Sequence, residues 1–399
     1  MVYLMHIILH YLLNHIMHQH LQFKKIWNLT SELSFLVGQC EAYVDAISNT
    51  PILPKHRSEL LQVALIKGAQ ATTAIEGNTL SEEEIEKIYD GASLPPSKEY
   101  QEHEVKNIIN AFNILFKEVV NDNRSNLITP ELICRFHEMV GRGLGKHFDA
   151  EPGRFRSDSR VVGLYRGPDY REVPSLMAKY CEWLRSEFHY ENGQSFGDTV
   201  IQAIVAHINL EWIHPFGDGN GRTSRLLEFY ILLRGGLPDI ASHILSNHYN
   251  QTRPEYYRHF DDARHKRDLN SFLMYALLGF RDGLKETLQI LHKSQFEVTW
   301  SKYVYDAFKA RKMTNKRVFN RQRNLALSLP HNRSFTASEI VLATPEIARD
   351  YANIQRRTVL SDLNLLTDMK VLAKQGSSEF RANKEVIWQL VAAKKEKVR

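Results

Sequence analysis

The spacing of apolar residues along the chain is mostly that of amphipathic helices. In the segment 198–212, Ile201, Ile204, Val205 and Ile208 recur at intervals of three and four, which places them on one helix face. The same period predicts helices over 30–46, 56–75, 104–120, 129–141, 223–233 and 279–291. The pattern therefore predicts a mainly α-helical bundle with two strongly apolar helices on either side of one short segment.

Polar residues mark where some of these helices begin and end. Gly77 stands where a glycine in the left-handed conformation can end the helix over 56–75. Directly afterwards, Ser81 and Glu84 have the spacing of a capping box, which predicts the start of a new helix. Further along, the turn-forming residues GPD at 167–169 predict a sharp reversal of the chain.

The segment between the two strongly apolar helices is polar and rich in glycine, with the sequence HPFGDGNGRTSR at 214–225. Gly217, Gly219 and Gly221 are expected to adopt positive φ values and to turn their N–H groups inward. Such a nest at a helix N-terminus binds anions. Arg222 and Arg225 are three residues apart, so both guanidinium groups are expected beside that anion.

The other polar residues of this segment suit the chemistry of a nucleotide. Asp218 offers hard oxygen ligands for Mg²⁺ bridging phosphates, and His214 can accept a proton from a hydroxyl nucleophile. Phe216 is expected to be buried and to hold the loop in place. A histidine before a glycine-rich turn is usually structural, and neither a dinucleotide fingerprint nor a P-loop is present. The combination within twelve residues nevertheless predicts a phosphate and Mg²⁺ site.

This segment resembles the Fic-domain signature H-x-F-x-[DE]-G-N-G-R-x-x-R at every defined position. The resemblance implies a transferase that moves AMP from ATP to a hydroxyl side chain of a target protein, or of itself, and releases pyrophosphate. It makes His214 the general base and Asp218 the Mg²⁺ ligand. The implied phosphate-binding residues are Gly219, Asn220, Gly221, Arg222 and Arg225, of which Arg225 reaches the γ-phosphate. Transfer of a phosphoryl-type group needs this positioning and charge neutralisation more than covalent catalysis.

A second stretch, TTAIEGN at 72–78, lies at the end of a predicted helix. Thr72 and Glu76 are four residues apart and share a helix face, and taken alone Glu76 is an exposed carboxylate. The stretch resembles the Fic inhibitory motif [ST]-x-x-x-E-[GN] through Thr72, Glu76 and Gly77. The resemblance implies that Glu76 pairs with Arg225 and leaves ATP in a non-productive pose. In some family members this glutamate is thought to position water for the removal of AMP.

Two further regions resemble Fic proteins more weakly. The sequence PGRFR at 152–156, followed by VVG at 161–163, resembles the segment that leads into a β-hairpin flap. There, Val162 and Gly163 would pair with an extended segment of the target through backbone hydrogen bonds. Tyr256 and Tyr257 match the tyrosine pair that packs near adenine, although both are equally compatible with core positions. The family also implies a homodimer.

The charge of the chain changes towards its C-terminus. Residues 300–399 hold 20 Lys and Arg against 9 Asp and Glu, a net charge of +11, whereas residues 1–299 carry −6. After a long helical stretch over 300–329, the pattern is a short helix, a turn and a helix, then small strands at 371–373 and 385–388. This order resembles a winged helix-turn-helix, which would bind DNA phosphates or dock a protein. Its exposed basic residues would be Arg356, Arg357 and Lys370, and its apolar face Val359, Leu363 and Leu366.

Length and composition bound the organisation of the chain. A chain of 399 residues is expected to form two or three domains. The three cysteines, Cys40, Cys134 and Cys181, have no metal-binding spacing and indicate reduced thiols in a cytoplasmic protein. Residues 2–17 are apolar, but histidines interrupt them and no basic flank precedes them, so no membrane segment is expected.

We therefore expect a mainly α-helical protein with a Fic-type helical bundle, a small β-hairpin flap and a C-terminal winged helix. Its function would be self-inhibited protein adenylylation with ATP and Mg²⁺ on Ser, Thr or Tyr of a target, and removal of AMP is a further implication. The alternative is a DNA-binding regulator whose Fic domain senses a nucleotide. The expected domains are an N-terminal extension (1–24), a region with the inhibitory helix (25–110), the catalytic domain (111–292), a helical linker (293–332) and the winged helix (333–399).

Overall fold

The computed structural model describes residues 18, 20–122, 127–162, 165–311, 315–330 and 333–387. The chain forms two compact units that divide after Gln289, and each unit is described by itself. The apolar N-terminal segment 2–17 and the lysine-rich C-terminal end lie outside the described residues. Within the described parts, no helix combines the length and the apolar character needed to cross a bilayer.

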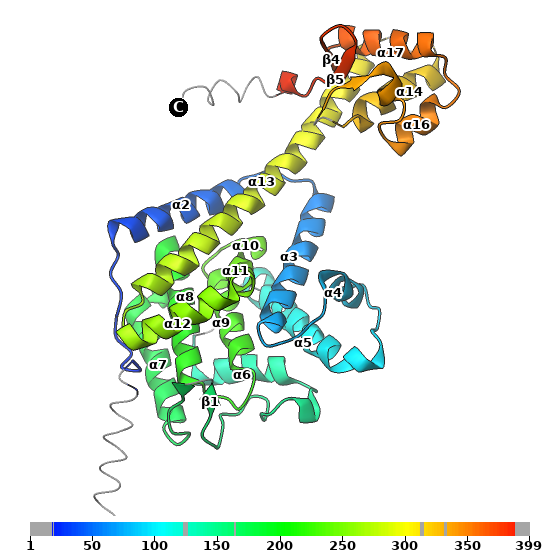
Figure 1. The fold of residues 1–399 in the computed structure, drawn as a ribbon. Helices are drawn as coiled ribbons and strands as arrows, with labels where there is room; N and C mark the ends of the chain where they lie inside the picture. The colour runs from blue at the N-terminus through cyan, green and yellow to red at the C-terminus, as the bar shows by residue number, and fades with distance from the viewer. Residues whose placement is uncertain are drawn as a thin grey trace, which may run out of the picture. The chain divides into compact units, whose positions relative to one another are not determined.

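Unit 1 is almost entirely helical, as the apolar spacing predicted (Figure 1). Its helices are α2 (Ser31–Ser48), α3 (Pro54–Ala74), α4 (Glu82–Tyr89), α5 (Glu99–Phe116), α6 (Pro130–Gly141), α7 (Val173–Phe188), α8 (Phe196–Ile213), α9 (Asn220–Arg234), α10 (Asp239–Ser242), α11 (Ile244–Gln251), α12 (Arg253–Lys266) and the first part of α13 (Asn270–Lys309). Single turns of other helix types lie at Pro96–Lys98, Lys117–Asn121, Gly145–His147 and Tyr190–Asn192.

Helix starts follow the local chemistry of the sequence. The predicted capping box of α4 is present, because the Ser81 hydroxyl accepts from the Glu84 N–H and the Glu84 carboxylate accepts from the Ser81 N–H. Thr30, Thr129 and Ser195 cap α2, α6 and α8 with their side-chain oxygens, each of which accepts from the N–H three residues further on. The predicted helices therefore exist, and most of their ends differ from the expected ones by a few residues. The helix expected over 279–291 is instead part of the much longer α13.

Helices α8 and α9 form the centre of unit 1 (Figure 1). The sequence predicted an apolar face on each of two buried helices, and both helices are buried along nearly all of their length. The reason is that α8 packs against α2, α7 and α9, while α9 also contacts α3, α5, α6 and α10. The loop between α8 and α9 is thus held between two deeply buried helices.

The end of the expected N-terminal extension is packed rather than free. His20 and Leu21 are buried, and His20 Nε2 lies 3.1 Å from the Tyr165 hydroxyl. Tyr165 in turn donates to the Trp212 carbonyl at the end of α8, at 2.6 Å. The residues from His20 onward therefore belong to the fold of unit 1.

Unit 2 has its own apolar core. Its elements are the second part of α13, α14 (Lys316–Ser328), β3 (Phe335–Thr336), α15 (Ala337–Ile340), α16 (Pro345–Tyr351), α17 (Arg356–Asp368), β4 (Leu372–Gln375) and β5 (Glu379–Ala382). The strands form an antiparallel sheet in the order β3-β5-β4. Val359, Leu363 and Leu366 of α17 lie in the core, as their spacing predicted.

Two expectations about the C-terminal region are wrong. The strand expected at 385–388 lies at 379–382 instead, because Gly376, with a φ of +62°, turns the chain directly after β4. Residues 385–387 are helical, and Trp388 is outside the described residues. The expected helical linker is also not a linker, since Trp300, Phe308 and Leu325 are buried in the core of unit 2.

Candidate functional site

The loop between α8 and α9 is shaped by two left-handed backbone positions. His214 ends α8 with a φ of +50°, and Gly219 begins α9 with a φ of +75°. The expectation of positive φ at Gly217 and Gly221 is wrong. Gly217 is needed for space instead, because a Cβ there would lie 2.4 Å from the Asp149 main-chain carbonyl. A Cβ on Gly221 would overlap the end of the Glu76 side chain.

The loop is held from inside by an aromatic ring and an amide. Phe216 is fully buried, as predicted, and stacks on the His137 ring at 3.8 Å between centroids. Asn220 exchanges two hydrogen bonds of 2.9 Å with the main chain of Phe216. The Asn220 side chain therefore fixes the loop, which leaves the N–H groups at the start of α9 as the candidate anion contacts.

His137 is a supporting residue that the sequence did not reveal. Its Nδ1 accepts from the Gly153 N–H at 3.0 Å, so Nε2 carries the proton and donates to the Asp218 carbonyl at 2.9 Å. Burial lowers the pKa of His137 to about 4, which keeps the ring neutral and this pattern intact at neutral pH. Asp218 is thereby held at the base of the loop.

His214 is placed by the second residue that the sequence missed, Arg156. The Arg156 Nε donates to the His214 carbonyl at 2.8 Å, and its Nη2 donates to the Pro168 carbonyl at 2.6 Å. Burial, followed by the positive charge of Arg156, lowers the pKa of His214 to about 4. The imidazole is therefore neutral at physiological pH and able to accept a proton.

Glu76 and Arg225, which the sequence places 149 positions apart, form an ion pair. Arg225 Nη2 donates to Glu76 Oε1 at 2.5 Å and to the Thr72 carbonyl at 3.0 Å, and Arg225 is 1% exposed. Desolvation is the largest single influence and raises the pKa of Glu76, but the charge and hydrogen bond of Arg225, together with the charge of Arg222, outweigh it, and the net pKa is lowered. Glu76 is therefore ionised and hydrogen-bonded to the Arg225 guanidinium. Gly77 follows with a φ of +100°.

Thr72 contributes through its main chain rather than its hydroxyl. Its carbonyl accepts from Arg225, whereas its buried Oγ1 has no hydrogen-bond partner among the described residues. The end of α3 is held by a further arginine, since Arg253 donates to the Ala74 carbonyl. Two guanidinium groups from α9 and α12 therefore bind the last turn of α3.

Arg222 is held by two carboxylates. Its Nη2 donates to Asp218 Oδ1 at 2.7 Å, and its Nη1 donates to Glu104 of α5. Glu104 is buried, but it was not predicted as a site residue because the apolar pattern does not mark its position as a core position. In this state Asp218 is bound to Arg222 and to the Gly219 N–H, at 2.5 Å.

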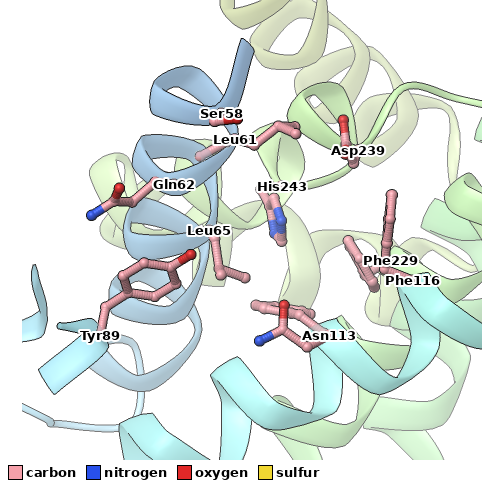
Figure 2. A pocket seen from close by; sticks show the side chains of 12 residues that line it. Ser58, Leu61, Gln62, Leu65, Tyr89, Asn113, Phe116, Phe229, Asp239 and His243 are labelled. Atoms are coloured by element: carbon pink, nitrogen blue, oxygen red, sulfur yellow. The ribbon is translucent and has the colours of Figure 1, made fainter. Parts of the chain in front are cut away.

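A polar cavity of about 170 Å³ lies beside these residues. Its lining is Glu76, Gly77, Asn78, Tyr100, Gln101, Glu104, Asp218 and Arg222. A second cavity of about 280 Å³ lies between α3 and the helices α5, α9 and α10, with Leu61, Leu65, Phe116 and His243 around it (Figure 2). The second cavity contains none of the motif residues, so the candidate site is the polar one.

The two candidate adenine-binding tyrosines have different environments. Tyr256 is buried with its hydroxyl 2.9 Å from His207 Nε2, so it occupies a core position. Tyr257 is 48% exposed and is the accessible member of the pair. The candidate flap residue Val162 lies in β1 (Val161–Val162), which pairs antiparallel with β2 (Tyr165–Arg166), and Gly163 lies outside the described residues.

The residues present fit a magnesium ion bound through phosphates. In the described parts of the chain, no group of three or more His, Cys, Asp or Glu side chains is arranged around a common point. Magnesium on a nucleotide usually needs only one or two protein carboxylates, because phosphates and water complete its octahedron. Asp218, whose side chain is 32% exposed and lines the polar cavity, is the carboxylate that could hold such an ion.

The sequence is similar to named adenylyltransferases over about half of its length. It is 32% identical over 208 residues to protein adenylyltransferase fic-1 of Caenorhabditis briggsae, which is 51% of this chain and 38% of the relative. To protein adenylyltransferase Fic of Nematostella vectensis it is 30% identical over 225 residues, 56% of this chain and 48% of the relative. The chain thus spans less than half of the length of these relatives.

Two solved structures share the fold. A Fic family protein from Desulfovibrio desulfuricans G20 aligns over 90% of this chain and 98% of its own, with a TM-score of 0.55 and 21% identity. Fic-1 (residues 134–508) from Caenorhabditis elegans aligns over 66% of this chain and 73% of its own, with a TM-score of 0.53 and 24% identity. Residues 127–232, which include the entire α8–α9 loop, match the Fic/DOC family. The chain therefore contains a Fic domain.

Proposed function

We propose that this chain is a protein adenylyltransferase that moves AMP from ATP to a hydroxyl side chain of a protein, and that α3 inhibits it. The proposal rests above all on the complete loop: a neutral His214, the N-terminus of α9, and Arg222 and Arg225 on its first turns. A nucleotide sensor needs the phosphate-binding residues but no base. The similarity to named adenylyltransferases supports the enzyme over the sensor.

Each residue has a defined part in the proposed reaction. The target hydroxyl loses its proton to the His214 imidazole while its oxygen bonds to the α-phosphorus of ATP. The bond from that phosphorus to the bridging oxygen breaks, and pyrophosphate leaves with the electron pair. Arg222 and Arg225 offset the charge on the phosphates. Mg²⁺, when bound by Asp218 and the phosphates, supplies further charge neutralisation.

Inhibition follows from the ion pair at the end of α3. Arg225 cannot orient the γ-phosphate while Glu76 Oε1 and the Thr72 carbonyl occupy its Nη2. Activation then requires the last turn of α3 to withdraw from Arg225. The same carboxylate, placed in the site, is proposed to position water when AMP is removed from a modified protein.

The test is the intact mass of the full chain after incubation with ATP and Mg²⁺. The wild type, Glu76→Gly and Glu76→Gly/His214→Ala are compared. We expect an added AMP on Glu76→Gly, little on the wild type and none on the double variant. If Glu76→Gly carries no adduct on itself or on proteins of an added lysate, the transferase proposal fails.

The pH profile of the reaction gives an independent prediction. Because the pKa of His214 is lowered to about 4, its base form exists above that pH and is lost below it. The initial rate of AMP incorporation by Glu76→Gly should therefore change little between about pH 8 and pH 5. A histidine with an ordinary pKa would lose half of the rate near pH 6.5. A half-maximal rate near that pH would show that His214 is not held neutral by its surroundings.

A second function is proposed for unit 2, namely binding of DNA phosphates by a winged helix-turn-helix. The supporting observation is the position of Arg356 and Arg357, both exposed on the first turn of α17, where the family of such folds places its recognition helix. Lys370 and Lys374 are exposed near β4. The region also carries a net charge of +11.

Binding of the full chain to a DNA duplex should fall with rising salt. Each arginine that contacts a phosphate adds about 0.9 to the slope of log K against log salt. Arg356→Gln/Arg357→Gln should therefore weaken binding and reduce that slope by about two. Fluorescence anisotropy measures both quantities, with Arg349→Gln, an exposed arginine of α16, as the matched control. Equal slopes for the variant and the control would exclude α17 as the binding element.

A further inference from the structure

We propose that Glu104, on α5 and outside the residues that match the family, is a positioning residue that aims Arg222 at the nucleotide phosphates. We further infer that Asn78 couples this orientation of Arg222 to the inhibitory segment, residues 72–78. The inference deepens the proposed function and rests on it. Its basis is a chain of buried contacts that joins α9, α5 and the turn after α3.

The Glu104–Arg222 pair is removed from water on both sides. The two side chains are 6% and 3% exposed, and the guanidinium also lies over the Phe148 ring, 5.4 Å from its centroid. A planar guanidinium with one nitrogen on Glu104 and the other on Asp218 has its orientation fully defined. Burial of a guanidinium without a counter-charge costs much free energy. The negative charge of Glu104 therefore allows Arg222 to be buried at this position.

The two carboxylates that hold Arg222 differ in their freedom. Asp218 lies in the loop with a side chain that is 32% exposed, so it can exchange Arg222 for a cation. Glu104 lies within α5, and its second oxygen is already bound. If Asp218 were to leave Arg222 in order to hold Mg²⁺, Arg222 would keep its Nη1 on Glu104. Its Nη2 would then be free to donate to a phosphate in the adjacent cavity, which both residues line.

Asn78 connects this arrangement to the inhibitory segment. Its Nδ2 donates to Glu104 Oε2 at 2.8 Å and to the Gln101 carbonyl at 3.1 Å. Asn78 is two residues after Glu76, in the turn that Gly77 forms with positive φ. Movement of Glu76 away from Arg225 therefore also displaces Asn78, whose side chain is hydrogen-bonded to Glu104. The turn at Gly77 is in this way linked to both arginines of the motif, to Arg225 through Glu76 and to Arg222 through Asn78 and Glu104.

The test is nucleotide affinity in the full-length Glu76→Gly chain, measured by titration with a fluorescent ATP analogue in Mg²⁺. Glu104→Gln keeps the shape of the side chain and removes its charge, and we expect it to raise the Kd at least tenfold. Asn78→Ala should raise the Kd about threefold, and it serves as the measured variant if Glu104→Gln does not fold. Glu118→Gln, directly after the end of α5, breaks the part-buried pair with Arg135; it is the matched control and should leave the Kd unchanged.

A double-mutant cycle separates positioning from a general structural effect. If Glu104 acts through Arg222, Glu104→Gln adds no further loss of affinity in an Arg222→Ala background. Equal losses in both backgrounds, or an unchanged Kd for Glu104→Gln and Asn78→Ala, would overturn the inference while leaving the ATP site intact. If the Glu76→Gly parent binds no nucleotide at all, the proposed function fails, and this inference fails with it.

Discussion

Replacing Glu76 with glycine is expected to raise the rate of AMP incorporation by about a hundredfold, the size of effect that one transition-state donor supplies. The reason is that Glu76 Oε1 lies 2.5 Å from Arg225 Nη2, where an oxygen of the γ-phosphate would bind. Incorporation is measured as the initial rate with labelled ATP. Glu76→Gln is the matched variant: it keeps the side chain but removes the charge, so it should activate less than glycine does.

The same substitution should also make the protein less stable in the absence of ATP. Arg225 is 1% exposed, and loss of its partner leaves a buried charge with fewer hydrogen bonds. A deficit of this kind costs about 1–3 kcal/mol, and saturating ATP should recover much of it because the phosphates replace the carboxylate. Thermal unfolding with and without ATP measures both effects. For the reaction rate, a Glu76→Gly chain that incorporates AMP as slowly as the wild type would contradict inhibition by α3.

The central loop was predictable because its determinants are local. Glycines, a histidine, a carboxylate and two arginines between two apolar helices already indicate a phosphate site, and Phe216 is buried as the pattern predicted. The conformations of the glycines were less accessible. Asp149 and Glu76 approach Gly217 and Gly221 from other parts of the chain and leave little room for a Cβ there, so the glycine spacing alone wrongly indicated positive φ.

The supporting residues could not be predicted because each one acts across a long stretch of sequence. Arg156 reaches the His214 carbonyl, His137 reaches the Asp218 carbonyl, and Glu104 reaches Arg222 from a separate helix. Nothing in the local periodicity distinguishes these residues from surface charges or from core histidines. Glu76 was identified only because its segment resembles a known motif. The local sequence indicates an exposed carboxylate near a helix end and does not show that it binds the buried Arg225.

The second unit shows a related limit. Periodicity predicted the apolar face of α17 correctly, because Val359, Leu363 and Leu366 share one helix face. It misplaced the last strand, because strand pairing depends on the turn at Gly376 rather than on apolar residues further on. The sequence also indicated a helical linker over 293–332, since the residues that pack with Trp300 and Phe308 in the core of unit 2 lie further along the chain.

Removal of the His214 imidazole is expected to have the largest effect of all. General-base catalysis contributes roughly 10²- to 10⁴-fold, so AMP incorporation by Glu76→Gly/His214→Asn should fall by at least about a hundredfold. Asparagine is a better test than alanine here. His214 has a φ of +50°, a conformation that asparagine adopts readily, and the main-chain bond from Arg156 is kept.

The control for this variant is nucleotide binding. In the proposed mechanism His214 acts on the target hydroxyl and not on the phosphates, which belong to Arg222, Arg225 and the N-terminus of α9. The Kd for ATP should therefore stay within about twofold of the Glu76→Gly parent, while the rate collapses. Retained transfer by His214→Asn would place the base elsewhere. Loss of rate and of ATP affinity together would instead show that His214 shapes the loop, because a base that acts only in the transition state leaves ground-state binding unchanged.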